Sequence, residues 1–244
     1  MIAGHFATAL LADQHAEGRR FPASLSGWFI VVSQIPDLLW FVFHFLGLEP
    51  TEPLDLFDTT LQSLSVEMAF SHHLVPILGW TLLLGVLGAV LFQSRRVGLA
   101  TAALVGVHAL MDYLSGHPHH LFGADTAEIG LGLYDSAPYV AIAIEAVITV
   151  ALALAFFREE RRRGVVRSAV SRRAIIGVLA FGIVFLVSTA TTSMREMLGL
   201  PAFDLPFGTT VPTLALTYLS MGLVLWAAVR RRNAPATRSL GGAA

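Results

Sequence analysis

Long apolar stretches follow one another along most of the chain. Each is close to the length of about 17 to 25 apolar residues that a helix needs to cross a bilayer. The six segments are Leu25–Leu46, His72–Gln93, Val97–Ser115, Ala137–Phe157, Ala174–Thr192 and Val211–Val229. A soluble protein rarely repeats buried helices of this length. The pattern therefore predicts an all-α, polytopic bundle of six transmembrane helices.

The stretch from Ile2 to Ala12 is shorter and less apolar than these segments, and Arg19 and Arg20 follow it. A secretory signal carries its positive charge before the apolar run, not after it. We therefore expect a retained helix that packs against the bundle. If this helix also crosses the membrane, the bundle has seven transmembrane helices and Met1 lies outside.

The composition fits a membrane protein. The chain is 55% hydrophobic and only 14% charged, whereas a soluble domain carries about 25% charged residues. It has no cysteine, which excludes a disulfide scaffold, a zinc finger, an iron–sulfur protein and a cysteine nucleophile. All 16 basic residues are arginine, and the net charge is −1. No broad basic face is evident, so we expect no nucleic-acid partner.

The arginines gather in alternate connections between the apolar segments. They lie before Leu25, at Arg95 and Arg96, over 158–173, and after Val229, whereas the other connections are mostly acidic. Cytoplasmic loops collect positive charge. We therefore expect the arginine-rich connections and the C-terminus in the cytoplasm and the acidic loops outside.

Composition also divides the chain. We expect a bundle over 1–157, a solvated, arginine-rich cytoplasmic loop over 158–173, two additional transmembrane helices within 174–232, and a flexible tail over 233–244. The two additional helices contain no histidine and no intramembrane acid. Their expected role is a scaffold, a shield for the rest of the bundle, or the interface of a homo-oligomer.

Titratable side chains at bilayer depth are costly, so they indicate function or a compensating partner. Inside the predicted spans lie Asp37, His108, Asp112 and Glu145. At 1.5 Å per residue, all of these fall in the outer half of the membrane. His72 lies at the outer mouth, and His5 reaches the same half if its helix spans. We therefore expect one site there, formed by residues from several helices.

His108 and Asp112 are four residues apart, which places them on one helix face. Imidazole and carboxylate donors at this spacing can bind one divalent cation, and sets of three or four suit zinc, manganese or iron. The same pair could instead form a buried hydrogen bond, and Glu145 could be a protonated acid that bonds across helices. His73 and His117 are candidate accessory ligands, whereas we expect His119 and His120 at the surface.

Four sequence strings carry a resemblance to a known family. They are Gly4-His5-Phe6-Ala7, Ile35-Pro36-Asp37, Phe70-Ser71-His72-His73-Leu74 and the His108-x-x-x-Asp112 pair. Over about residues 1–157 the chain resembles the bacterial inner-membrane family of membrane-bound metal-dependent hydrolases, in its uncharacterised or permease-like branch. The resemblance implies a multi-pass protein of the bacterial cytoplasmic membrane. It also implies metal ligation by His5, Asp37, His72, His108 and Asp112.

The chain departs from the family at two positions. His73 stands where many members have a small residue, and Glu67 stands where many have a histidine. With zinc as the favoured ion, a bound water would have a pKa of about 7, and Glu145, Asp112 or Glu67 is the expected general base. A site open to the outer face predicts hydrolysis of a membrane lipid or a lipid-linked ester or phosphoester.

Two further functions fit the same residues. A transporter or permease also uses intramembrane acids and histidines, and a scaffold could bury a structural metal ion. The inner halves of the predicted helices are almost entirely Leu, Val, Ala and Gly, and inverted repeats are not evident. Both features favour a pocket open to one side over a path through the membrane.

Overall fold

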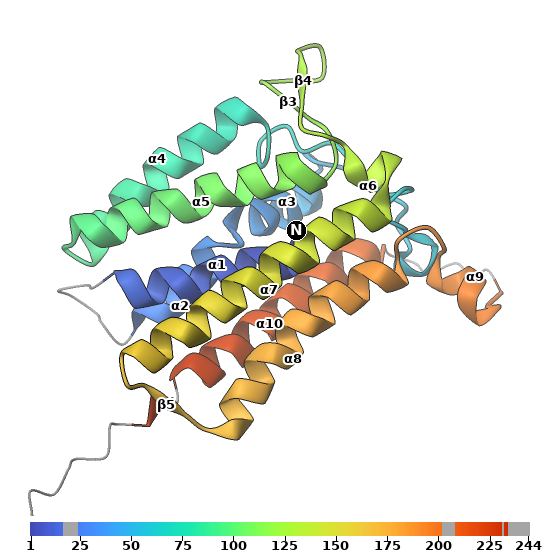
Figure 1. Cartoon of the computed structure of the whole chain (residues 1–244). Helices are drawn as coiled ribbons and strands as arrows, with labels where there is room; N and C mark the ends of the chain where they lie inside the picture. The colour runs from blue at the N-terminus through green and yellow to red at the C-terminus, as the bar shows by residue number, and fades with distance from the viewer. Residues whose placement is uncertain (17–23, 202–207, 231, 234–244) are drawn as a thin grey trace, which may run out of the picture.

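The computed structural model describes residues 1–16, 24–201, 208–230 and 232–233, and these form a helical bundle (Figure 1). Its helices are α1 (Ile2–His15), α2 (Leu25–Val32), α3 (Ile35–Phe45), α4 (Leu74–Leu91), α5 (Arg95–Ser115), α6 (Leu133–Ser136), α7 (Pro138–Arg162), α8 (Ala169–Ser188), α9 (Met194–Leu198), α10 (Thr210–Arg230) and the 3-10 helix η2 (Leu56–Asp58). The predicted all-α bundle is confirmed.

Three short antiparallel strand pairs connect these helices. They are β1 (Thr51–Glu52) with β2 (Ser65–Val66), β3 (His119–His120) with β4 (Glu128–Ile129), and β5 (Val166–Arg167) with β6 (Arg232–Asn233). Asn233, which we expected to begin the flexible tail, thus pairs with Val166. The rest of that tail, and Arg19 and Arg20, lie outside the described residues.

Within the described residues, five helices are long and apolar enough to cross a membrane, namely α4, α5, α7, α8 and α10. A sixth span exists only if α2 and α3 count together, since they are bent by 61°. The prediction of a continuous helix over 25–46 is therefore wrong. Pro36 explains the break, because its ring clashes with the carbonyl four residues earlier, at Val32, and it cannot donate to that carbonyl.

Helix α1 lies inside the bundle and is not a candidate span. Its 14 residues cover about 21 Å, less than the roughly 30 Å of a bilayer core. It packs against α7, α2, α8 and α5, and most of its side chains are buried. The structure therefore adds no seventh span within the described residues.

Helices α4 and α5 form a closely packed pair at the edge of the bundle (Figure 1). Glycines allow this approach: a Cβ added to Gly98 would lie 2.7 Å from the carbonyl oxygen of Gly85, and one added to Gly88 would lie 2.7 Å from Thr101 Oγ1. Small residues serve the same purpose at many helix interfaces in membranes. This pair matters because both helices lead to candidate site residues.

The two additional helices belong to the same hydrophobic core as the first 157 residues. Helix α8 packs against α1 and α7, and α10 packs against α8, α2 and α3. A Cβ added to Gly182 of α8 would lie 3.0 Å from the Cβ of Ala3. Both helices thus lie in direct contact with the elements that carry the predicted site.

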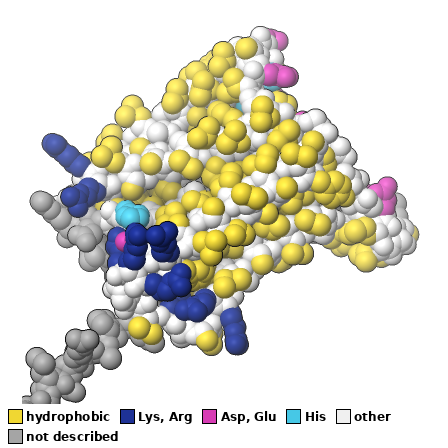
Figure 2. Space-filling view, viewed as in Figure 1, with side chains coloured by type: hydrophobic (Ala, Val, Ile, Leu, Met, Phe, Trp, Pro, Cys, Tyr) yellow, Lys and Arg dark blue, Asp and Glu magenta, His cyan; other side chains and the backbone are white. Residues whose placement is uncertain are grey.

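Charge separates the two ends of the bundle. Figure 2 shows the arginines at one end and acidic side chains at the other, with hydrophobic side chains over the surface between them. One arginine, Arg195, lies at the acidic end, where Asp55 accepts from its Nη2 at 2.6 Å and Asp58 also pairs with it. Hydrogen bonding to Asp58 raises the pKa of Arg195.

The arginine-rich stretch over 158–173 is neither a loop throughout nor uniformly solvated, contrary to our expectation, because α7 continues to Arg162 and α8 begins at Ala169. Arg167 is buried and makes a two-pronged ion pair with the buried Glu160. Its Nη1 also donates to the carbonyl of Ala228 at 2.6 Å, near the end of α10. Arg167 therefore joins the ends of α7 and α10.

Candidate metal centre

Five predicted site residues lie together in the interior. His5 belongs to α1, and Asp37 lies in the first turn of α3. His72 lies two residues before the start of α4, and His108 and Asp112 belong to α5. All five are buried. At 1.5 Å per residue, His108 lies about 20 Å along α5 from Arg95. The cluster is therefore in the half of the bundle away from that arginine.

Asp112 is at the centre of the cluster. Its Oδ1 lies 3.2 Å from His5 Nε2, and its Oδ2 lies 3.1 Å from His108 Nε2. The amino group of Met1 lies 2.5 Å from Oδ1. The rings of His5 and His108 stack with their centroids 3.6 Å apart. Two imidazoles thus meet one carboxylate side by side.

Asp37 closes the cluster on the opposite side. Its Oδ1 lies 3.5 Å from His72 Nε2, and its Oδ2 lies 3.8 Å from His108 Nε2. Its place in the first turn of α3 also suits a carboxylate, since a helix N-terminus carries partial positive charge. The bend created by Pro36 therefore delivers Asp37 to the interior.

The bend also orients His108. The Nδ1 of His108 lies 2.8 Å from the carbonyl oxygen of Ser33, between α2 and α3. Only a protonated Nδ1 can donate to that oxygen, so in the neutral ring the lone pair is on Nε2. This lone pair faces Asp37 and Asp112, as a metal ligand requires.

A serine and a glutamate orient His72 in the same way. Ser71 Oγ donates to Glu49 Oε2 at 2.8 Å and lies 2.8 Å from His72 Nδ1. Since the hydroxyl proton is used on Glu49, Ser71 accepts from Nδ1 and leaves the Nε2 lone pair toward the carboxylates. Glu49 is fully buried, and the backbone amides of Phe70 and Ser71 also donate to it. Sequence reasoning missed this residue.

The cluster leaves ligand atoms without hydrogen bonds. His5 Nδ1, Asp37 Oδ2 and His108 Nε2 are buried and have no hydrogen-bond partner, whereas native proteins satisfy most such atoms. Two groups of three residues each place their ligand atoms within 4.8 Å of one another. One group is His5, Asp37 and His108, and the other is His72, His108 and Asp112. Histidine nitrogens and carboxylate oxygens are donors for zinc, manganese and iron. These residues therefore can hold a divalent metal ion.

Two of the three expected general bases, Glu145 and Glu67, lie outside these ligand groups. Glu145 is fully buried, accepts from the amide of Ala3 at 2.8 Å, and lies 3.4 Å from the hydroxyl of Tyr134. It thus holds the first turn of α1 against α7. Glu67 has an exposed side chain beside β2. The structure places neither carboxylate in a candidate ligand group.

Further histidines lie next to the cluster. His119 is buried, contrary to our expectation, and its ring stacks on His72 with centroids 5.4 Å apart. His73 lies against His120, at 5.2 Å between ring centroids. Burial, with nearby His120 and His72, lowers the pKa of His73 to about 4; burial also lowers that of His119.

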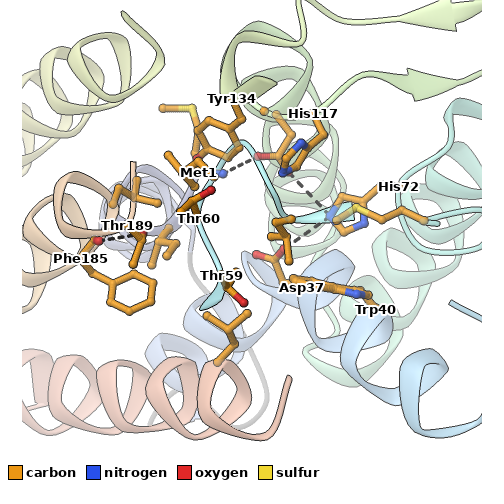
Figure 3. A pocket seen from close by; sticks show the side chains of 18 of the residues that line it. Met1, Asp37, Trp40, Thr59, Thr60, His72, His117, Tyr134, Phe185 and Thr189 are labelled. Atoms are coloured by element: carbon orange, nitrogen blue, oxygen red, sulfur yellow. Dashed lines mark hydrogen bonds and ion pairs between the residues drawn. The ribbon is translucent and has the colours of Figure 1, made fainter. Parts of the chain in front are cut away.

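A cavity of about 90 Å³ adjoins the cluster. Asp37, His72 and Asp112 form part of its wall, and most of the remaining wall is apolar. Figure 3 shows His117, His72 and Asp37 along one side, across from Phe185 and Thr189 of the α8 region. Leu214 and Tyr218 of α10 also line it. The two additional helices therefore help to enclose the candidate site.

No family model, curated protein or solved structure matches the chain.

Proposed function

We propose that this membrane protein is a metal-dependent hydrolase that cleaves an ester or phosphoester of a lipid or lipid-linked molecule. The observation that carries this proposal is the set of buried imidazole nitrogens and carboxylate oxygens that face one another beside an apolar cavity. The resemblance of residues 1–157 to membrane-bound metal-dependent hydrolases supports the same reaction class.

His72, His108, Asp37 and Asp112 would hold the metal ion, with His5 as a fifth donor. When bound, zinc would lower the pKa of a water molecule to about 7 and polarise the bond to be cleaved. Manganese and iron are the alternative ions. Ser33 and Glu49 would keep the imidazoles of His108 and His72 oriented, as outer partners of metal ligands commonly do.

The cavity walls support an apolar substrate. Leu61, Leu64 and Met68 come from the connection between α3 and α4, and Leu186 and Leu214 come from α8 and α10. These side chains would cover the apolar part of the substrate next to the cleaved bond. If the arginine-rich end is cytoplasmic, the reaction takes place at the outer side of a bacterial cytoplasmic membrane.

Metal analysis tests the centre directly. We expect detergent-purified protein, loaded with zinc and desalted, to retain about one ion per chain, and His108→Ala and Asp112→Ala to retain almost none. His120→Ala is the matched control, because His120 belongs to the same histidine-rich region but to neither candidate ligand group. A wild-type chain that binds no zinc, manganese or iron would overturn the proposal.

Activity then separates a hydrolase from the other functions. Zinc-loaded protein should cleave p-nitrophenyl octanoate or bis(p-nitrophenyl) phosphate, and His108→Ala should not. A metal-loaded chain that cleaves neither probe contradicts the hydrolase proposal and favours a metal-binding scaffold. Metal movement across vesicles by the same preparation would instead favour a transporter.

A further inference from the structure

His117 forms a dyad with Asp135 at the edge of the cavity. Its Nδ1 lies 2.6 Å from Oδ1 of Asp135, which belongs to the short helix α6. The other ring nitrogen, Nε2, is buried and has no hydrogen-bond partner. His117 nevertheless lines the cavity that Asp37, His72 and Asp112 also line (Figure 3). The structure thus presents an unpartnered imidazole nitrogen beside the candidate metal centre.

The surroundings hold this imidazole in place. Its ring packs edge-on against Tyr134 with centroids 5.3 Å apart, and Tyr134 in turn bonds to Glu145. Gln62 Nε2 donates to the backbone carbonyl of Asp135 at 3.0 Å. Gly132 starts α6 in the left-handed region, at φ +57°, where its lack of a side chain avoids strain. Asp135 and Tyr134 are thereby fixed on both sides of His117.

His117 belongs to neither group of candidate metal ligands. An accessory ligand role, expected from the sequence, would require other donors around its Nε2, and the ligand groups found among the described residues do not include it. Asp135 accepts from Nδ1, so the neutral ring carries its lone pair on Nε2. A base oriented by a carboxylate is the arrangement that proton transfer to a reacting group requires.

We propose that His117 transfers protons in the hydrolysis and that Asp135 is its positioning residue. This inference rests on the proposed function and replaces Glu145, Asp112 and Glu67 as the expected general base. Glu145 is used in holding α1 and Tyr134, Asp112 is at the centre of the candidate ligands, and Glu67 is exposed. His117, in contrast, lines the shared cavity and has a buried ring nitrogen without a hydrogen-bond partner.

The step balances with water as the co-reactant. His117 Nε2 takes a proton from water as the water oxygen forms a bond to the acyl carbon or phosphorus. The bond from that atom to the leaving oxygen breaks, and the leaving oxygen takes the proton back from Nε2. The products are an acid and an alcohol, and His117 returns to its neutral form with Nδ1 still bonded to Asp135.

The first test compares His117→Asn with wild type in zinc-loaded, full-length protein, using p-nitrophenyl octanoate and bis(p-nitrophenyl) phosphate as probes. We expect kcat to fall by about 10²- to 10⁴-fold, the usual contribution of general acid–base catalysis. KM and the zinc content should not change, since the group acts only in the transition state. His120→Asn is the matched control and should keep both kinetic constants.

The second test measures which nitrogen of His117 carries the proton, and it needs no substrate. In ¹⁵N-histidine NMR spectra, with the signal assigned by its loss in His117→Asn, wild-type His117 should be protonated at Nδ1. Asp135→Ala should redistribute the proton between the two nitrogens and lower kcat while zinc stays bound. A wild-type signal protonated at Nε2 alone contradicts the dyad.

Three kinetic outcomes are distinct. If loaded wild type cleaves a probe and His117→Asn cleaves it equally fast, His117 has no proton-transfer role and the proposed function stands. If His117→Asn loses its zinc, His117 is a ligand and the inference is wrong. If loaded wild type cleaves neither probe, the proposed function fails and the role of His117 fails with it.

Discussion

Two buried polar clusters lie at opposite ends of this bundle, and they differ in how fully their atoms are paired. At the arginine-rich end, Arg167 places donors on both oxygens of Glu160 and on the carbonyl of Ala228. At the other end, His108 Nε2 and Asp37 Oδ2 face one another with no hydrogen bond. Both clusters are equally hidden from solvent.

This difference in pairing distinguishes polar groups that are buried to hold the fold together from polar groups that are buried to bind a ligand. The attraction between a buried guanidinium and a buried carboxylate offsets their desolvation only when good geometry and further hydrogen bonds satisfy both groups. Arg167 and Glu160 meet these conditions, so that cluster joins helices without a further ligand. Lone pairs that converge without protons between them are unfavourable unless another group fills the space. In the second cluster Asp112 already pairs with the amino group of Met1, whereas the unpartnered atoms of Asp37 and His108 can bind a further cation. The following variants test this contrast between the two clusters.

The largest effect on stability is expected at the paired end. Arg167→Met leaves the buried Glu160 carboxylate without its partner, so the free energy of unfolding should fall by about 3–5 kcal/mol. Denaturation by SDS in mixed micelles measures it. Arg163→Met, which removes an exposed ion pair with Glu159, should change nothing measurable. Zinc retention should be normal in both, and a loss in Arg167→Met would contradict the independence of the two clusters.

The next largest effect on stability is expected where α4 and α5 pack closely together. Gly98→Ala places a Cβ 2.6 Å from that of Ala89 and 2.7 Å from the Gly85 carbonyl oxygen, so α4 and α5 must separate. Overpacking of this kind costs about 1–3 kcal/mol. Gly106→Ala is the control on the same helix, because its added Cβ would meet no atom within 4 Å beyond its own stretch of helix. Equal unfolding curves for the two variants would refute the close contact.

A substitution beside the candidate metal ligands should change the metal affinity more than the stability of the fold. Ser71→Ala removes the hydroxyl between Glu49 and His72, so zinc affinity should fall by about 10- to 100-fold. Competition with a fluorescent zinc chelator measures the change. Ser65→Ala, at an exposed position of β2, is the control. An unchanged affinity in Ser71→Ala would mean that His72 needs no outer partner or is not a ligand.

The smallest effect concerns a single hydrogen bond in the scaffold. Trp28 Nε1 donates to Thr101 Oγ1 at 2.8 Å and joins α2 to α5. Trp28→Phe, Thr101→Val and the double variant should give a coupling energy of about 1 kcal/mol in SDS unfolding. Fully additive effects would show that this contact contributes nothing.

The sequence predicted the spans well because apolar length is a local property. Predicted and observed helices coincide within a few residues for five of them, such as 211–229 against Thr210–Arg230. The exception is the broken segment, where hydropathy continues through Pro36 and conceals the 61° bend. The length and composition of a segment indicate whether it can enter a membrane, but they do not indicate whether its helix bends.

The candidate site was predictable only in part. His108 and Asp112 share a helix face by spacing alone, and depth indicated Asp37 as a neighbour. Glu49 could not be found this way, because it lies in a connection and reaches Ser71 only through the fold. Likewise His119 belongs to a hairpin whose register with Ile129 buries it. Contacts between distant connections depend on tertiary packing, which periodicity does not record.

The central position of α1 has a consequence for how the protein is made. Its buried faces are covered by α7 and α8, whose residues are synthesised more than 120 positions later. A ribosome that has finished α5 has therefore produced His5, Asp37, His72, His108 and Asp112 but not the helices that enclose them. Assembly of the centre has to wait for the last third of the chain, so truncation before α8 removes the site while leaving all of its candidate ligands in place.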